Sequence, residues 1–421
     1  MTLATSSLAM KRLSASVIWP LRIGLAVIVL AFFLLPDTFL GRLLPLQTYD
    51  FLEQDGIYFT LGQEVLLLPI IALVWLSYER VSRADANAQR LWLLLGGLFA
   101  VHILYCFYPP LRLGALRCCL YLLAPIGAGL LATRLCGRLR YALALLLVLV
   151  LLQGGYAFTA YLHAKHIVVS GTVRRAGGTF DAPNTLGLLS AAALPITYLF
   201  LREPRPLWQR ALSGLCFFGL MGLMALSGSR AAALGLAVAT VWMLWKVTEQ
   251  RRQSPLRSAW FWGGITASLG AILLINGMRL WGHINRVSTD RSSLGHLRLW
   301  RHGFHVFVKH WLFGAGLGYI SLATEDNIVD YVAYDPENLL LQWLEQFGVI
   351  GGVLFLLAVY LIVRAIKGRS LYHITLQAMW AATIVVGCFN PVLATSSMAG
   401  GALVGVLLGS TLLLPADSDA N

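Results

Sequence analysis

The chain has 421 residues, of which 58% are hydrophobic and only 12% are charged, and its mean hydropathy is +0.72. A soluble globular domain is nearer one-half apolar, so this composition excludes an ordinary soluble protein and predicts one that crosses a membrane several times. The formal net charge of +13 comes mostly from Lys and Arg beside apolar segments, so it does not indicate a nucleic-acid partner.

Apolar segments long enough to cross a bilayer recur along the whole sequence. A helix needs about 20 apolar residues to span the hydrocarbon core, and an α-helix satisfies its own backbone polar groups there. We therefore predict an all-α, polytopic membrane protein with about 12 transmembrane helices, forming a single membrane domain over residues 1–421. The predicted spans are 18–36, 59–78, 91–108, 116–133, 141–161, 185–201, 211–227, 231–247, 258–276, 348–366, 373–390 and 398–415.

Clusters of Lys and Arg fall in alternate loops between these spans. Loops rich in Lys and Arg stay in the cytoplasm, so the pattern predicts that both termini lie there and that the first span is a retained anchor. The clusters lie at residues 11–12, 80–90, 134–140, 202–210, 246–257 and 364–369.

Cysteine and histidine give no sign of a metal or disulfide site. The six cysteines lie in or beside predicted spans, which argues against a disulfide framework. Five histidines between residues 283 and 310 have irregular spacing and none forms a His-Glu-x-x-His pattern. We therefore expect neither a metal nor another cofactor.

Cations also occur in the segments predicted to face outward. The loop at 162–184 holds Lys165, Arg174 and Arg175, a short turn ends in Arg230, and the large loop at 277–347 holds six more cations, including Arg298. Arg binds phosphate oxygens in a bidentate manner, so we predict one outward-facing basic site. Acidic residues in the same segments leave open the alternative that some of these Arg form ion pairs.

Two of these cations have a distinctive local sequence. Arg175 precedes Gly177 and Gly178, which allow a tight backbone turn, and Asn184 is predicted to cap the next helix. Arg175 has no evident partner in the sequence, and the alternative is a simple capped loop. Arg230 opens a span with almost no loop before it, and its alternative is snorkelling to the interface.

The large outward loop contains an amphipathic segment at residues 297–312, which predicts a helix lying at the membrane interface. The glycines at Gly314, Gly316 and Gly318 then predict a structural turn. The tryptophans in or near this loop, including Trp300 and Trp343, are predicted to be interfacial anchors, with sugar stacking as the alternative.

The order of these motifs resembles that of the O-antigen ligase and polymerase superfamily of bacterial inner-membrane proteins. The resemblance covers roughly residues 165–365. It implies a GT-C-like helical protein with one large periplasmic loop and an active site facing the periplasm, acting on undecaprenyl-diphosphate-linked glycans. The matching positions are Arg175, Gly178, Thr179, Phe180, Pro183, Asn184, Ser229, Arg230, Arg298, Trp300, Gly314, Gly316, Gly318, Glu337, Asn338, Gly348 and Gly351.

The chain departs from the family pattern at Glu337, where the family usually has His. The resemblance implies that this residue is the general base that activates the acceptor hydroxyl, a role a carboxylate can fill. The alternative is an acidic residue that interacts with the helix dipole. Asn338 is predicted to orient Glu337 or to cap the helix that starts there.

The resemblance also implies that guanidinium groups bind the donor diphosphate. We assign this role to Arg175, Arg230, Arg298 and Arg174, with Asn184 and Asn338 in support. The missing His favours a polymerase of O-antigen or exopolysaccharide repeat units, acting without a metal and with inversion, and a chain-length regulator is its candidate protein partner. The alternatives are a ligase that transfers the glycan to lipid A core or protein, and a flippase or transporter.

Overall fold

The computed structural model describes residues 19–31, 34, 125–163, 167–170, 173–177, 183–203, 205–250, 291–315, 338–390 and 398–414. The predicted spans at 59–78, 91–108 and 258–276 lie outside these residues, and so does Glu337. The total of about 12 spans therefore stays a prediction.

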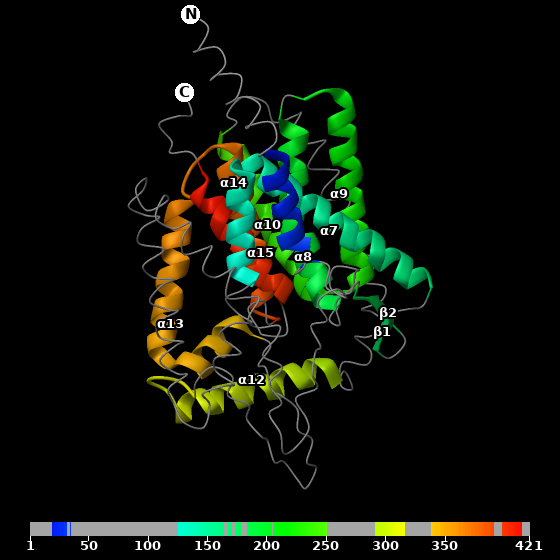
Figure 1. Ribbon diagram of the computed structural model, residues 1–421. Coiled ribbons are helices and arrows are strands. Elements are labelled where there is room, and N and C mark those ends of the chain that lie inside the picture. Colours follow the sequence, from blue (N-terminus) through cyan, green and yellow to red (C-terminus); the bar gives the residue numbers. More distant parts are fainter. Residues whose placement is uncertain are drawn as a thin grey trace, which may run out of the picture.

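The described part of the chain is a bundle of apolar helices with one small hairpin (Figure 1). Five of its helices are long and apolar enough to cross a membrane, which confirms a polytopic helical membrane protein. These five are α7 (Leu139–Leu162), α8 (Pro183–Arg202), α9 (Leu207–Ser227), α10 (Arg230–Gln250) and α13 (Leu339–Ala365). The others are Trp19–Ala31, Pro125–Cys136, α12 (Arg291–Lys309), α14 (Leu371–Gly387) and α15 (Met398–Leu412).

Helix α8 occupies the centre of the bundle, where it packs against α7, α9, α10 and α14. Its most apolar window is 83% buried, against 33% for α9, α10 and α13, which present much of their surface outward. The middle of α8 is a run of alanines at 191–193, and such small side chains let neighbouring helices approach closely.

Helix α15 packs closely against the helix Pro125–Cys136 through glycine. A Cβ added to Gly405 would lie 2.1 Å from the carbonyl oxygen of Ile126, and one added to Gly129 would lie 2.4 Å from that of Ala402. Since these are contacts with backbone, no side-chain rotation can relieve them. The two helices meet backbone to backbone.

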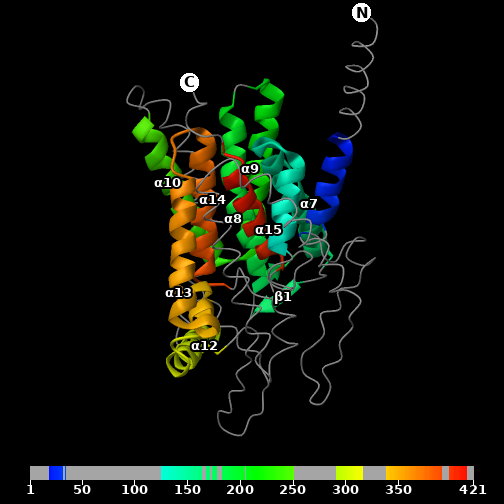
Figure 2. The same cartoon turned by 60° about the vertical axis from the view of Figure 1, so that its left-hand side comes forward.

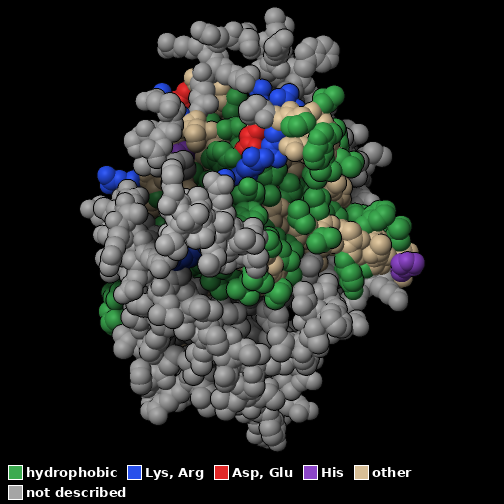
Figure 3. Space-filling view, turned by 45° about the horizontal axis from the view of Figure 1, so that its top comes forward, with side chains coloured by type: hydrophobic (Ala, Val, Ile, Leu, Met, Phe, Trp, Pro, Cys, Tyr) green, Lys and Arg blue, Asp and Glu red, His purple; other side chains and the backbone are tan. Residues whose placement is uncertain are grey.

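The bundle has two ends, each formed by a different set of turns. The α8–α9 turn, the α13–α14 turn and the last turn of α10 lie at one end, which we call the basic end (Figures 1 and 2). The hairpin, the α9–α10 turn and α12 lie at the other, the hairpin end. On the face that Figure 3 shows, Lys and Arg side chains lie near the basic end, above a flank of hydrophobic side chains. This separation agrees with the alternation of charged loops in the sequence, although which end is cytoplasmic stays a prediction.

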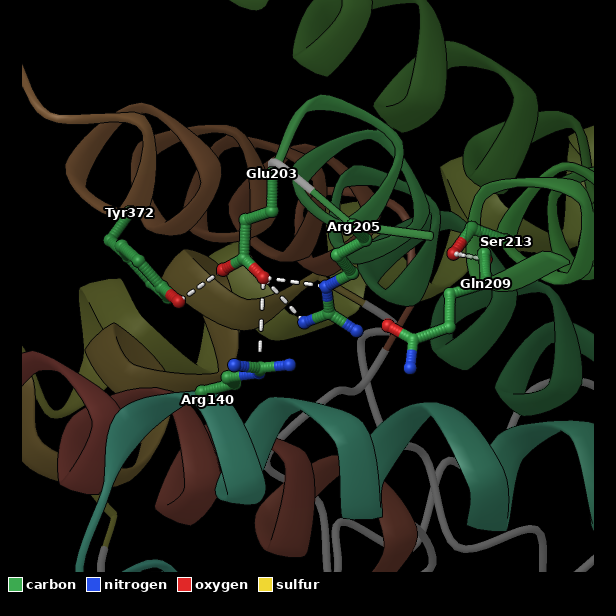
Figure 4. A network of polar contacts seen from close by, with 6 residues as sticks. All are labelled: Arg140, Glu203, Arg205, Gln209, Ser213 and Tyr372. Atoms are coloured by element: carbon green, nitrogen blue, oxygen red, sulfur yellow. Dashed lines mark hydrogen bonds and ion pairs between the residues drawn. The ribbon is translucent and has the colours of Figure 1, made fainter. Parts of the chain in front are cut away.

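At the basic end, Glu203 joins three parts of the chain (Figure 4). Its carboxylate accepts hydrogen bonds from Tyr372 of α14 and from Arg205, whose Nε lies 2.8 Å away. Arg140 of α7 lies 3.8 Å from the same carboxylate. The guanidinium of Arg205 also stacks 4.4 Å from the ring centroid of Phe200. This network ties α7 and α14 to the α8–α9 turn.

The predicted all-α fold misses one feature, an antiparallel hairpin inside the loop at 162–184. It consists of β1 (Ile167–Ser170) and β2 (Val173–Ala176), with Val168 paired to Arg175. Ile167, Val168, Val169 and Val173 are β-branched, which favours strands. The hairpin matters because β2 carries both Arg174 and Arg175 to the end of the bundle.

Candidate functional site

The turn between α9 and α10 provides one half of the candidate site. Gly228 ends α9 in a left-handed conformation with φ of 59°, which favours glycine. The Ser229 hydroxyl oxygen then accepts a hydrogen bond from the backbone N–H of Ala232 at 3.3 Å, as an N-cap does. Only two residues separate the helices, so Arg230 begins α10 at the hairpin end and its side chain is exposed.

Arg175 reaches this turn from strand β2. Its Nε donates to the carbonyl oxygen of Ser227 at 2.8 Å, and its Nη2 donates to Oδ1 of Asn184 at 2.6 Å. The last carbonyls of a helix have no partner within the helix, so the end of α9 provides a ready acceptor. The expectation that Arg175 lacks a partner is therefore wrong, because the acceptors come from distant parts of the chain.

Both acceptors are neutral, so they orient the guanidinium without cancelling its charge. None of the ion pairs found among the described residues includes Arg175. Burial and the positive charge of Arg230 lower the pKa of Arg175, yet a guanidinium starts so high that it stays protonated at neutral pH. The two cations thus repel one another, and an anion placed between them would relieve that repulsion.

Asn184 does not cap α8 as predicted. The helix begins at Pro183, which suits the first helical position because proline has no N–H to leave unsatisfied there. Asn184 is therefore already inside the first turn, and its side chain orients Arg175 instead. The sequence pattern predicted that the Asn184 side chain would bond to the backbone of α8, whereas it accepts a hydrogen bond from Arg175.

Gly187 lets α8 lie directly against the α9–α10 turn. A Cβ at this position would lie 2.8 Å from both Ser227 Oγ and Ser229 Cβ, and 2.9 Å from Ala232 Cβ. Because a larger residue would push the turn away from α8, Gly187 helps to fix the distance between Asn184 and the carbonyl that holds Arg175.

The first turn of α13 lies at the same end of the bundle. Asn338 is its N-cap: Oδ1 accepts from the N–H of Leu341 at 3.0 Å. Its Nδ2 also donates to the carbonyl oxygen of Cys388 at 2.8 Å, which ties the start of α13 to the end of α14. Of the two predicted roles for Asn338, the structure thus shows the cap. Glu337 precedes it in the chain but lies outside the described residues, so its role stays a prediction.

Helix α13 is broken at Gly348, where φ is 64° and ψ is −160°. A loop at the end of α12, residues 311–315, packs against the break, and we call it the docking loop. The N–H of Val349 donates to the carbonyl of Trp311 at 2.8 Å, and the N–H of Ala315 donates to the carbonyl of Glu345 at 2.8 Å. The docking loop thus satisfies backbone groups that the break would leave exposed in the membrane.

Two glycines make this contact possible, and a third, Gly351, allows the two parts of α13 to approach across the break. A Cβ on Gly314 would lie 2.3 Å from the backbone of Gln346, and a Cβ on Gly348 would lie 2.4 Å from the backbone of Leu312. A Cβ on Gly351 would lie 2.0 Å from that of Phe347, across the break. Gly314 confirms the predicted turn, whereas Gly316 and Gly318 lie outside the described residues.

The other predicted diphosphate ligands are placed only by their backbone. Arg174 lies on β2, opposite Val169, and Arg298 lies on α12, but the structure describes neither side chain. The predicted amphipathic segment is confirmed as a helix by α12, which begins earlier than expected. The assignment of Arg174 and Arg298 to the site stays a prediction.

Two buried residues of α13 differ from the sequence-based expectation. Trp343 is neither an anchor nor a sugar platform, since it is 7% exposed and packs in the core against Phe347 and Phe355, with ring centroids 4.9 and 5.5 Å away. Glu345 is only 3% exposed and had no predicted role. An acid inside a hydrophobic helix is the signal that identifies it as a functional candidate.

Comparison with known families adds an independent finding. The model of a family described as O-antigen ligase matches residues 214–356, which run from α9 into α13. The match includes Arg230, Arg298, Glu337 and Gly348, whereas Arg175 lies before it. No curated protein matches the sequence significantly.

Proposed function

We propose, from the match of residues 214–356 to a family described as O-antigen ligase, that this chain polymerises undecaprenyl-diphosphate-linked oligosaccharide repeat units of an O-antigen or exopolysaccharide. The observation that carries the proposal is the position of Arg175, held by two neutral acceptors beside Arg230. The reaction occurs at the hairpin end, which we assign to the periplasm of a bacterial inner-membrane protein. Both termini then lie in the cytoplasm.

The paired guanidinium groups bind the donor diphosphate. As the glycosyl bond breaks, negative charge grows on the phosphate oxygen that leaves, and cations already in place stabilise that charge without reorganising. Arg175 is suited to this because its hydrogen bonds to Ser227 and Asn184 fix the guanidinium. Arg298 and Arg174 complete the set, and the guanidinium groups supply the positive charge that a metal ion supplies in other glycosyltransferases.

Glu337 acts as the general base on the acceptor. It takes the proton from an acceptor hydroxyl as that oxygen bonds to the anomeric carbon of the donor sugar. The bond between this carbon and the diphosphate oxygen breaks, its electron pair leaves with undecaprenyl diphosphate, and the anomeric centre inverts. Asn338 supports this role because its two hydrogen bonds fix the backbone next to Glu337.

The test is glycan elongation by the purified protein supplied only with lipid-linked repeat units. We expect longer lipid-linked chains from the wild type. We expect none from Glu337→Gln, Arg175→Ala or Arg230→Ala, at unchanged protein levels in the membrane. Arg210→Ala is the matched control, since Arg210 is an exposed cation at the basic end. Full activity of Glu337→Gln would remove the base assignment, and unchanged donor affinity in the Arg variants would remove the clamp.

A ligase is the second candidate, because the family model that matches is described as O-antigen ligase. A ligase would make no longer chains from repeat units alone, but would transfer glycan once lipid A core or an acceptor protein is added. A flippase loses support because the family consists of glycosyltransferases. A chain-length regulator is the partner we propose for a polymerase, and its effect would appear as a narrower distribution of product lengths.

A further inference from the structure

Helix α12 crosses the hairpin end of the bundle instead of running along the bundle axis, and both ribbon views show this placement (Figures 1 and 2). Its buried side includes Gly303 and Val306, and it packs against α13. A helix that crosses the end of membrane-spanning helices has the orientation of a helix that binds in the headgroup region.

The opposite side of α12 is apolar and exposed. Leu297, Phe304 and Val308 are each more than half exposed. At 3.6 residues per turn they fall within an arc of about 40°. Trp311, Leu312 and Phe313 of the docking loop extend this apolar surface. So much exposed apolar surface on one side of a helix indicates an interaction site.

Cations border this apolar stripe along one edge. Arg301 and Lys309 are exposed and lie eight residues apart, on the same side of the stripe, with exposed His305 between them. Residues 291–315 contain no Asp or Glu at all. An apolar stripe with a cationic border complements the surface of an anionic lipid leaflet. The stripe can contact the acyl chains, and the cations can contact the negatively charged headgroups.

We infer that α12 binds the headgroup region of the leaflet at the hairpin end, with Arg301 and Lys309 on anionic lipid phosphates, and so positions the start of α13. The link is the docking loop, whose backbone hydrogen bonds fasten α12 to both sides of the break at Gly348. The part of α13 before that break begins directly after its N-cap, Asn338, so a shift of the docking loop would be transmitted to the start of α13. The part of this inference that concerns activity rests on the proposed function, whereas the lipid contact does not.

The contact is tested by photo-crosslinking in nanodiscs, with p-benzoylphenylalanine in place of Phe304. We expect a phospholipid adduct by mass spectrometry. The same group in place of Phe218, which is 66% exposed on α9, is the positive control, and in place of buried Val306 it is the negative control. Crosslinks from position 304 only to protein, whether a second copy or another chain, would overturn the inference.

The role of charge is tested by hydrogen exchange in nanodiscs of phosphatidylcholine alone or mixed with phosphatidylglycerol. Each cation near an anionic surface contributes about fivefold to binding. We therefore expect the α12 amides to exchange about fivefold or more slowly in the anionic nanodiscs. Arg301→Gln with Lys309→Gln should abolish this difference, whereas Arg138→Gln with Arg210→Gln, the same charge change at the basic end, should not. Equal exchange in both lipids would overturn the inference.

Elongation measured in the same nanodiscs separates the two proposals. We expect wild-type elongation to be faster in anionic lipid and the α12 double variant to lose that dependence. A wild type that elongates equally in both lipids would refute the positioning role of α12 while leaving the polymerase intact. A wild type that binds lipid through α12 but elongates in neither would refute the polymerase while leaving the lipid contact intact.

Discussion

Replacing Gly348 with alanine tests whether the break in α13 is built around the docking loop. With φ of 64° and ψ of −160°, Gly348 has a backbone conformation that is essentially restricted to glycine. The added Cβ would lie 2.4 Å from the backbone carbon and oxygen of Leu312, and backbone cannot rotate away as a flexible side chain can.

The expected destabilisation has two sources. The backbone conformation costs about 1–3 kcal/mol with a side chain present. Displacing the docking loop also lengthens the hydrogen bonds from Val349 to Trp311 and from Ile350 to Leu312, each worth about 0.5–1.5 kcal/mol net. We therefore expect Gly348→Ala to lower the free energy of unfolding by roughly 2–6 kcal/mol.

The assay is the fraction of detergent-solubilised protein that remains monodisperse after heating, followed by elongation activity on the surviving fraction. Gly222→Ala is the matched control, because Gly222 lies inside α9 with no atom within 4 Å of an added Cβ. Alanine there should be neutral or stabilising by up to about 1 kcal/mol. If Gly348→Ala were as stable and active as Gly222→Ala, the break would not depend on the docking loop.

Three further substitutions test other contacts. Arg175→Lys keeps the charge but loses the two hydrogen bonds to Ser227 and Asn184, so donor affinity should fall about tenfold in a binding assay while the protein stays folded. Unchanged donor affinity would show that the positive charge alone is sufficient. Asn338→Ala should cost about 1 kcal/mol for the lost cap and also lower elongation, as measured by melting and chain length; a loss of stability with full activity would mean that the start of α13 need not be held. Glu203→Gln leaves Arg205 without its carboxylate at the basic end, so it should lower the free energy of unfolding by about 1–3 kcal/mol without changing the Michaelis constant for donor. A change in that constant would contradict the separation of the two ends.

The spans were predictable where hydropathy alone determines them. Helices α7, α8, α9 and α10 each coincide with a predicted span to within a few residues, since about 20 apolar residues between charged turns have no other stable arrangement in lipid. The α9–α10 turn was also evident, because Ser, Gly and Ser between two apolar segments are the residues that end one helix and cap the next.

What the sequence could not reveal are contacts between segments that are distant along the chain. The spacing of Asn338, Gly348 and Gly351 was visible in the sequence. That Gly348 breaks α13 where the docking loop packs was not, because no nearby residues in the sequence indicate a contact between that loop and α13. The partners of Arg175 are likewise 9 and 52 residues away. The hairpin was missed because strands of four residues are too short for a periodic pattern.

The backbone contact between α15 and the helix Pro125–Cys136 has a consequence for how the protein is made. The helix Pro125–Cys136 is synthesised before Gly405 of α15. The side of this helix that contains Gly129 therefore lacks its packing partner until α15 has also been synthesised. Chains that terminate before residue 398 would leave that side without its neighbour.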